Sequence, residues 1–242
     1  MKVAASAPGK IVLLGEYAVL DGAPALVMAA NRRAEVLLET GDEDSCTVHA
    51  PDVSSKAAKF SLDRDGTLHW HDVSAAVRQN FRLVAQILMS LVRQGILSVA
   101  GTPAFTATLV TMDFFQRGSG GDKNKLGLGS SAALTVAFAS ALAEYTGVSL
   151  PRQDPNAWLM TLLNAHRRFQ DGRGSGLDIA ASLYGGVIGY CVNNENKPQI
   201  EQLELPPELQ LLFVWSGRSA STTRFLDGVE DSRARNPQLI KA

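Results

Sequence analysis

The segment Lys125-Leu-Gly-Leu-Gly-Ser-Ser-Ala-Ala133 combines residue types that are suited to holding a phosphate group. Gly127 and Gly129 allow the backbone to approach a ligand closely and to adopt dihedral angles that other residues avoid. Ser130 and Ser131 can cap the apolar helix that we expect to follow, whose free N–H groups and positive end then face the turn. The segment is neither a Walker A loop nor a G-x-G-x-x-G motif. A glycine-serine helix start without any ligand is the alternative.

A lysine inside an apolar stretch is the second feature that points to anion chemistry. Lys10 directly follows Pro8-Gly9 and precedes Gly15-Glu16-Tyr17. A buried ammonium needs an anionic partner. The alternative is a lysine whose stem is buried while its ammonium reaches water.

Two further clusters carry charge beside small residues. Asp178 follows Gly174-Ser175-Gly176-Leu177 and lies on the first turn of an expected helix of small residues, which would let a substrate approach closely. It could also serve only to stabilise the positive end of that helix. In the segment Trp215–Thr222, an expected strand ends in a hydroxyl-rich turn that contains Arg218. This pattern predicts a second anion site or an ordinary capped turn.

The elements that would position these groups mix helices and strands without regular βαβ alternation, which favours an α+β fold. We expect helices from Ser74 to Gly95, over 130–146 with Gly147 as its end, from Asp154 to about Phe169, near 175–184 and over 222–229. We expect strands over 3–5, 10–14, 34–40, 46–50, 60–62, 105–110, 187–192 and 209–215. Residues 117–124 are expected to form a polar loop.

Composition narrows the class of protein. With 242 residues and 45% hydrophobic content, the chain can bury a substantial core. A formal net charge of −1 argues against nucleic-acid binding and against an anionic membrane surface. The uncharged span 126–143 is interpreted as a buried helix and not as a membrane helix. Two distant cysteines and no recognisable signal peptide favour a reducing, cytoplasmic location, and a homodimer is left open.

Taken together, the motifs resemble those of the GHMP kinases, the group of galactokinase, homoserine kinase and mevalonate kinase. Pro8-Gly9-Lys10 with Gly15-Glu16-Tyr17 is similar to their first motif, and 126–133 is similar to their ATP-phosphate loop. The resemblance implies a GHMP-kinase-like N-terminal domain (ribosomal protein S5 domain 2-like) over 1–193. It also implies that 194–242 begin an incomplete, ferredoxin-like C-terminal domain, because the family's third glycine-rich motif is not found in the chain.

Within the family, the pattern from Ala165 to Asp178 and the segment 215–222 are similar to phosphomevalonate kinases. Tyr17 stands where mevalonate kinases usually carry histidine. Mevalonate kinases also place a metal-binding glutamate about eleven residues before the aspartate, and that spacing lands on Arg167. The resemblance therefore implies phosphorylation of 5-phosphomevalonate by ATP, and it leaves the second Mg²⁺ ligand open.

The resemblance also implies roles for individual residues. Lys10 and Asp178 are expected to be catalytic, and Ser131 to bind Mg²⁺. ATP phosphates are expected to contact Lys125, Gly127, Leu128, Gly129, Ser130, Ser131 and Ala132. A small, phosphorylated mevalonate-type acid is expected to contact Glu16, Tyr17, His166, Ser175, Gly176, Arg218, Ser219, Ser221 and Thr222. Arg218 is the first candidate for the cation that holds the substrate phosphate, and His166 or Arg167 is the second.

Two alternatives stay open at this point. One is mevalonate kinase or another small-molecule kinase of the same family. The other is a binding module that has kept the fold and lost turnover, which the missing third motif favours and which the retained Lys10, Ser131 and Asp178 oppose.

Overall fold

The computed structural model describes residues 1–41, 45–117, 123–170, 172, 174–193, 195 and 197–217. The chain divides into two compact units. The first joins Met1–Phe114 to Leu128–Pro207, and the second joins Phe115–Gly127 to the residues that follow Pro207. The domain boundary predicted after residue 193 stays a prediction.

The first unit is built on a sheet of eight strands, counted over the described residues. The strands run in the order β10-β9-β2-β6-β3-β4-β5, and β1 pairs with β2. Neighbouring strands are antiparallel except β3 and β6, which are parallel. Their bounds are β1 (Lys2–Leu14), β2 (Ala25–Thr40), β3 (Cys46–His49), β4 (Ala58–Leu62), β5 (Leu68–His71), β6 (Phe105–Val110), β9 (Val187–Val192) and β10 (Pro198–Leu203).

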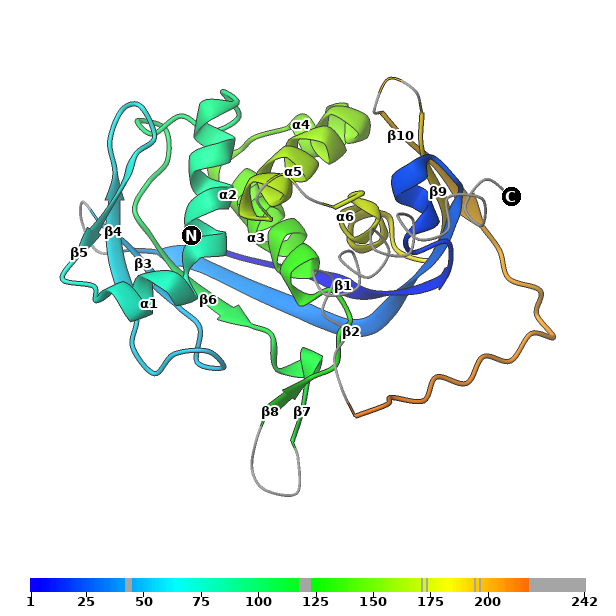
Figure 1. Ribbon diagram of the computed structural model, residues 1–242. Helices are drawn as coiled ribbons and strands as arrows, with labels where there is room; N and C mark the ends of the chain where they lie inside the picture. Colours follow the sequence, from blue (N-terminus) through cyan, green and yellow to red (C-terminus); the bar gives the residue numbers. More distant parts are fainter. Residues whose placement is uncertain are drawn as a thin grey trace, which may run out of the picture. The chain divides into compact units, whose positions relative to one another are not determined.

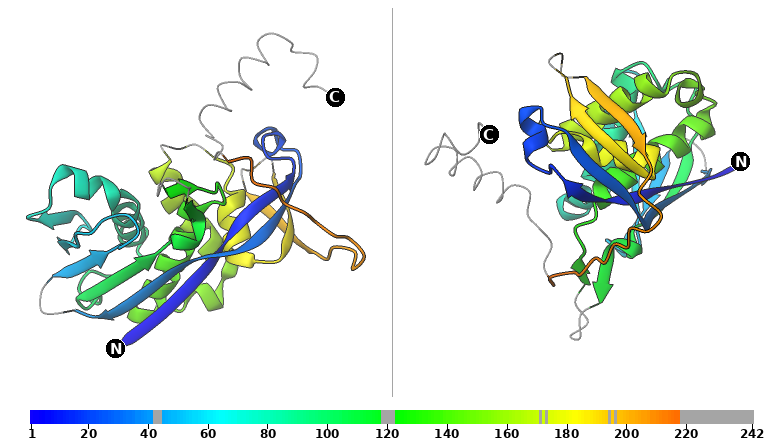
Figure 2. Two further views of the ribbon diagram at one scale, coloured as in Figure 1. Left: turned by 90° about the horizontal axis from the view of Figure 1, so that it is seen from below. Right: turned by 90° about the vertical axis from the view of Figure 1, so that its right-hand side faces the viewer.

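The helices of this unit gather on one face of the sheet (Figures 1 and 2). Helix α3 packs against β1 and β2, α6 packs against α3 and β1, and α5 packs against α2. Their bounds are α1 (Ala75–Asn80), α2 (Arg82–Arg93), α3 (Ser130–Thr146), α4 (Leu150–Gln153), α5 (Pro155–Phe169) and α6 (Leu177–Tyr184), with short 3-10 turns at Ala18–Asp21 (η1) and Met112–Phe114 (η2). The α+β class predicted from the sequence is confirmed, since helices and a largely antiparallel sheet form one unit.

Helix α3 is apolar around most of its circumference because it lies between the sheet and four other helices, α2, α4, α5 and α6. Phe138 and Leu142 are fully buried, and Gly147 ends the helix in the left-handed conformation. This burial accounts for the uncharged span seen in the sequence. In the part of the chain that the structure describes, no helix is long and apolar enough to cross a membrane.

The boundaries of several elements differ from those expected. The strand β1 is continuous and crosses Pro8-Gly9 with a shift in register, because an irregular pairing accommodates the turn-forming residues within the strand. The expected helix from Ser74 divides at Phe81, whose non-helical backbone and buried ring separate α1 from α2. Strands β5 and β10 and the first part of β2, 25–33, were not predicted, since each is defined by its pairing partner.

The second unit contains a short hairpin of β7 (Phe115–Arg117) and β8 (Lys123–Lys125), where a loop was expected. The strand expected over 209–215 is not formed in the described structure. These residues have no paired strand, and Leu212 and Val214 are 89% and 84% exposed. An apolar run becomes a strand only where a neighbouring strand supplies hydrogen bonds. The helix expected over 222–229 lies outside the described residues.

Candidate active site

Strand β1 carries the predicted lysine to the start of helix α3. The backbone N–H of Lys10 donates a hydrogen bond to the carbonyl oxygen of Leu128 at 2.8 Å. The contact requires glycine at the preceding position, because a Cβ on Gly9 would lie 2.5 Å from the same oxygen and 2.7 Å from the ring of Phe114. The sequence pair Gly9-Lys10 is thus explained by the close approach of the strand to the glycine-serine turn.

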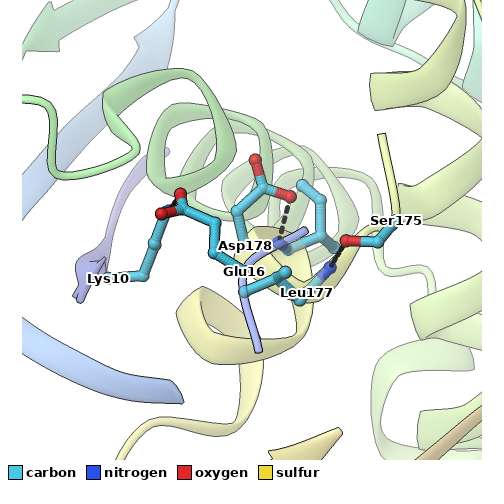
Figure 3. A network of polar contacts seen from close by, with 6 residues as sticks. Lys10, Glu16, Ser175, Leu177 and Asp178 are labelled. Carbon is cyan, nitrogen blue, oxygen red and sulfur yellow. Dashed lines mark hydrogen bonds and ion pairs between the residues drawn. The ribbon is translucent and has the colours of Figure 1, made fainter. Parts of the chain in front are cut away.

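The side chain of Lys10 lies across Gly129, the residue that precedes helix α3. A Cβ added to Gly129 would be 3.0 Å from Cγ of Lys10 and 3.7 Å from its Cε. The ammonium forms an ion pair with Glu16, with 3.2 Å between Nζ and Oε1 (Figure 3). The Lys10 side chain is only 16% exposed, whereas that of Glu16 is 50% exposed. The ammonium of this partly buried lysine therefore has an anionic partner in Glu16, and its contact with a phosphate group stays a prediction.

Helix α3 begins without a side-chain cap. Gly129 occupies the N-cap position in the left-handed conformation, with φ of 75°. Ser130 and Ser131 are the first helical residues, so the prediction that they cap the helix is wrong. A cap residue must lie outside the helix for its oxygen to reach the free N–H groups. Gly129 thus provides no side-chain partner for the first backbone N–H groups of the helix, and such groups can bind a phosphate.

His166 joins helix α5 to this helix start. Its side chain is buried, with 2% exposure, and Nε2 lies 3.2 Å from Oγ of Ser131. Burial lowers the pKa of His166 below its ordinary value of 6.5, and the negative charge of Asp178 opposes that shift. The pKa direction favours a neutral imidazole at pH 7.

Asp178 is held on the first turn of helix α6. Its Oδ1 accepts a hydrogen bond from the backbone N–H of Ile179 at 3.0 Å (Figure 3). Gly176 precedes the helix with φ of 88°, and a Cβ there would lie 2.2 Å from Leu163 Cδ2. Only glycine permits this turn, so the Gly176 position and the packing of Leu163 together set the start of helix α6.

The loop before helix α6 is fixed by strand β9. Tyr190 donates a hydrogen bond from its hydroxyl to the carbonyl oxygen of Ser175 at 2.6 Å. Burial raises the pKa of Tyr190 to about 12, so the phenol stays protonated and remains a donor. The hydroxyl of Ser175 accepts a hydrogen bond from the N–H of Leu177 at 3.4 Å (Figure 3). Tyr190 was not predicted from the sequence, because nothing local links it to Ser175.

The structure thus brings together residues from four separated segments of the first unit. The first segment carries Lys10 and Glu16, and the second carries Gly129 and Ser131. His166 and Asp178 come from the third and the fourth. Lys125 and Gly127 belong to the second unit, and their contact with ATP phosphates stays a prediction. Arg218, Ser219, Ser221 and Thr222 lie outside the described residues. Tyr17 occupies the N-cap position of η1, and its contact with a substrate stays a prediction.

The donor set at the helix start suits a cation that arrives with phosphate groups. In the described residues, no group of three or more His, Cys, Asp or Glu side chains could hold a metal ion alone. Mg²⁺ retains water molecules and needs only one or two protein ligands when phosphate oxygens supply the others. The half-buried Ser131 hydroxyl beside an uncapped helix start fits that requirement.

Comparison with known proteins shows which kinases the chain is similar to. Residues 120–186, which include the turn, helix α3 and Asp178, match the GHMP kinases N terminal domain. This part of the chain is similar to the N-terminal domain of GHMP kinases. A mevalonate kinase from Thermococcus gammatolerans is 29% identical over 241 residues, which cover 100% of this chain and 65% of that protein. A phosphomevalonate kinase from Streptomyces sp. (strain CL190) is 32% identical over 247 residues, which cover 89% of this chain and 62% of that protein.

Solved structures confirm the GHMP kinase fold. A Lin0012 protein from Listeria innocua superposes with a TM-score of 0.73 at 24% identity, covering 98% of this chain and 67% of that one. Streptococcus pneumoniae phosphomevalonate kinase, in complex with phosphomevalonate and AMPPNP, gives a TM-score of 0.68 at 17% identity, covering 95% of this chain and 67% of that one. The chain spans 65% and 62% of the lengths of the two curated relatives.

Proposed function

We propose that this GHMP kinase chain is the nucleotide-binding part of a kinase that transfers the γ-phosphoryl group of ATP to 5-phosphomevalonate in the cytoplasm. The single observation that carries the proposal is the position of Lys10 across Gly129. It places a cation beside the uncapped start of helix α3. The same helix start contacts His166, whose pKa is influenced by the charge of Asp178. Phosphoryl transfer depends mostly on positioning and charge neutralisation, and these groups provide both.

The roles of the residues follow from their chemistry. Backbone N–H groups at the start of helix α3 hold the nucleotide phosphates, and Ser131 ligates Mg²⁺ together with phosphate oxygens. When bound, the metal neutralises phosphate charge. Lys10 exchanges its partner Glu16 for the transferred phosphoryl group, whose negative charge is larger. An oxygen of the acceptor phosphate bonds to the γ-phosphorus as the bond to the ADP oxygen breaks.

Asp178 has a different task for each class of acceptor. The second pKa of a phosphate monoester is about 6, so the attacking oxygen of 5-phosphomevalonate is mostly ionised at pH 7 and needs no base. Asp178 then orients Lys10 and the metal. An alcohol acceptor such as mevalonate would instead lose its proton to this carboxylate during transfer.

The mevalonate kinase alternative has its own support. The Thermococcus gammatolerans relative that aligns over all of this chain is a mevalonate kinase. Against it, helix α5 presents His166 to the helix start, and Arg167 stands at the spacing where the resemblance expects the metal-binding glutamate of mevalonate kinases. An imidazole and a guanidinium cannot replace that carboxylate as a Mg²⁺ ligand, because Mg²⁺ prefers oxygen.

The test compares the two acceptors and measures nucleotide binding in parallel. The purified chain is assayed with ATP, Mg²⁺ and either mevalonate or 5-phosphomevalonate, and ADP binding is measured by calorimetry. We expect saturable ADP binding and a preference for 5-phosphomevalonate in any turnover. A preference for mevalonate would overturn the substrate assignment. ADP binding without turnover on either acceptor would favour the binding-module alternative, and absence of ADP binding would overturn the proposal altogether.

A further inference from the structure

His166 and Ser131 form a contact between two helices whose ends meet at the candidate site. Nε2 of His166 lies 3.2 Å from Oγ of Ser131. The imidazole is 2% exposed, whereas Ser131 is half-buried, so Ser131 lies closer to the surface than the ring. The contact therefore connects a buried ring to a residue at the start of helix α3.

A serine hydroxyl by itself has no fixed direction. It carries one proton and two acceptor lone pairs, and it rotates to suit its neighbours. A hydroxyl that binds a cation uses a lone pair and retains its proton, which must then point elsewhere. At 3.2 Å, the ring nitrogen of His166 is placed to accept that proton, and a lone pair of the Ser131 oxygen then stays available for a cation.

The backbone on both sides of the contact is fixed independently. The carbonyl oxygen of Ser131 accepts a hydrogen bond from Oγ1 of Thr135 at 2.8 Å. On helix α5, the ring of His166 lies 6.2 Å from the ring of Phe169, measured between centroids. The guanidinium of Arg82 lies over Phe169 at 5.4 Å and donates to its carbonyl oxygen at 3.3 Å. The imidazole is thus held by packing that does not involve Ser131.

We propose that His166 is a positioning residue that directs the Ser131 hydroxyl oxygen toward a phosphate-bound cation, and does not itself contact the acceptor. The inference rests on the proposed nucleotide-binding function. The burial of the His166 ring and the contact of its Nε2 with Ser131 argue against the direct substrate contact that the sequence suggested for His166. A residue that orients a metal ligand typically affects metal affinity or activity by about 10–100-fold.

The test separates an effect on the metal from an effect on the nucleotide. ADP binding to the chain is measured by calorimetry with and without Mg²⁺ for the wild type, His166→Leu and His166→Gln. We expect His166→Leu to weaken MgADP binding by about tenfold or more, while binding of metal-free ADP stays unchanged. His166→Gln, whose amide can reach Ser131, should retain most of the affinity. Equal weakening of ADP with and without metal, or no change in either, would overturn the inference.

Two controls keep the outcome specific. Thr161→Val removes a buried hydroxyl from the same helix, where Thr161 donates to the carbonyl oxygen of Ala157 at 2.9 Å, and it should leave MgADP binding unchanged. In a Ser131→Ala background, His166→Leu should cause no further loss of MgADP affinity. A further loss there would mean that His166 acts through another group.

A measurement on the wild-type protein covers the case in which the variants do not fold. The chain has four histidines, so ¹⁵N resonances of the imidazoles can be assigned. On addition of MgADP, Nε2 of His166 should show the shift of an unprotonated, accepting nitrogen, and a protonated Nε2 would overturn the proposal. If the wild type binds no ADP, the proposed function itself fails. If it binds MgADP and His166→Leu does not change this, only the positioning role fails.

Discussion

The aliphatic side chain of Lys10 crosses Gly129 at the point where helix α3 begins. Only 3.0 Å would separate Cγ of the lysine from a Cβ at that glycine. The glycine therefore serves two purposes at once. It adopts the left-handed backbone that starts the helix, with φ of 75°, and it leaves the space through which the lysine reaches Glu16.

Gly129→Ala should disturb both the left-handed backbone and the path of Lys10. A left-handed backbone costs a non-glycine residue about 1–2 kcal/mol, and the new methyl group would also displace Lys10. We expect a loss of that size in the free energy of unfolding and a decrease of at least about tenfold in MgADP affinity, equivalent to 1.4 kcal/mol. Chemical denaturation and calorimetry measure the two quantities.

The matched control for Gly129→Ala lies at the other end of the same helix. Gly147 has φ of 73°, and a Cβ there would meet nothing within 4 Å. Gly147→Ala should reduce the free energy of unfolding by a similar amount and leave nucleotide affinity unchanged. Equal losses of affinity in the two variants would show that backbone strain, and not displacement of Lys10, is responsible.

Asp178→Asn tests whether a general base is required. With 5-phosphomevalonate, the attacking oxygen is already ionised, so kcat should fall by less than about tenfold. An alcohol acceptor would need the base, and general-base removal typically costs about 10²–10⁴-fold. Steady-state kinetics with both acceptors on one preparation provide an internal control. A loss with 5-phosphomevalonate as large as that of an alcohol kinase would contradict the proposed role.

Sequence alone predicted the elements whose signals are local. Asp154 caps helix α5 by accepting from the N–H of Ala157 at 2.9 Å, and Pro155 occupies the first turn, as expected from the order of these residues. Gly147 ends helix α3, also as expected. The structure gives Lys10 an anionic partner in Glu16, whereas the role of Lys10 at a phosphate group stays a prediction.

The remaining features depend on residues distant in sequence. The first part of β2 pairs with β9, so that Ala25 faces Tyr190, and no local pattern at Ala25 indicates this strand. The uncapped start of helix α3 could not be predicted, because a Gly-Ser-Ser sequence fits a cap at either serine until the position of Gly129 is known. The contact of His166 with Ser131 likewise needs the packing of two helices.

Gly176→Ala should show that the start of helix α6, and hence Asp178, is set by packing against Leu163. The new Cβ would lie 2.2 Å from Leu163 Cδ2, and overpacking of this kind costs about 1–3 kcal/mol. A further cost of about 1–2 kcal/mol comes from φ of 88° at this residue. The free energy of unfolding, measured in urea, should fall by the sum.

A double-mutant cycle identifies the clash as the cause of that loss. Leu163→Ala alone removes a buried side chain and should cost about 2–5 kcal/mol. Combined with Gly176→Ala, it removes the clash. The loss of unfolding free energy in the double variant should therefore be smaller than the sum of the two single losses. Strict additivity would mean that Leu163 moves away without cost and does not set the position of Asp178.

The two cysteines should differ in reactivity toward a thiol reagent such as DTNB. Cys46 is 8% exposed, and burial raises its pKa, which decreases the fraction of reactive thiolate. Cys191 is only half-buried, and its thiol donates to Oε1 of Gln199 at 3.3 Å. We expect one thiol to react in the native protein and the second only after unfolding. Cys191→Ser should abolish the native reaction, and a fast reaction in that variant would contradict the burial of Cys46.

Asp63 should make the hairpin of β4 and β5 sensitive to acid. Its Oδ1 accepts from the N–H of Thr67 at 2.7 Å, and its Oδ2 lies 2.8 Å from Nε2 of His69. A hydrogen bond with Asp65 and the one with His69 lower the pKa of Asp63 from 3.8 to about 2. Because the folded pKa is lowered, the stabilisation is present above about pH 4 and is lost as the pH falls toward 2.

Asp63→Asn should therefore be less stable than the wild type at pH 7, and the difference should shrink between pH 4 and pH 2, as measured by urea denaturation. Glu201→Gln, which removes an exposed carboxylate from β10, serves as the control, and a difference for Asp63→Asn that stays constant with pH would contradict the role of the charge.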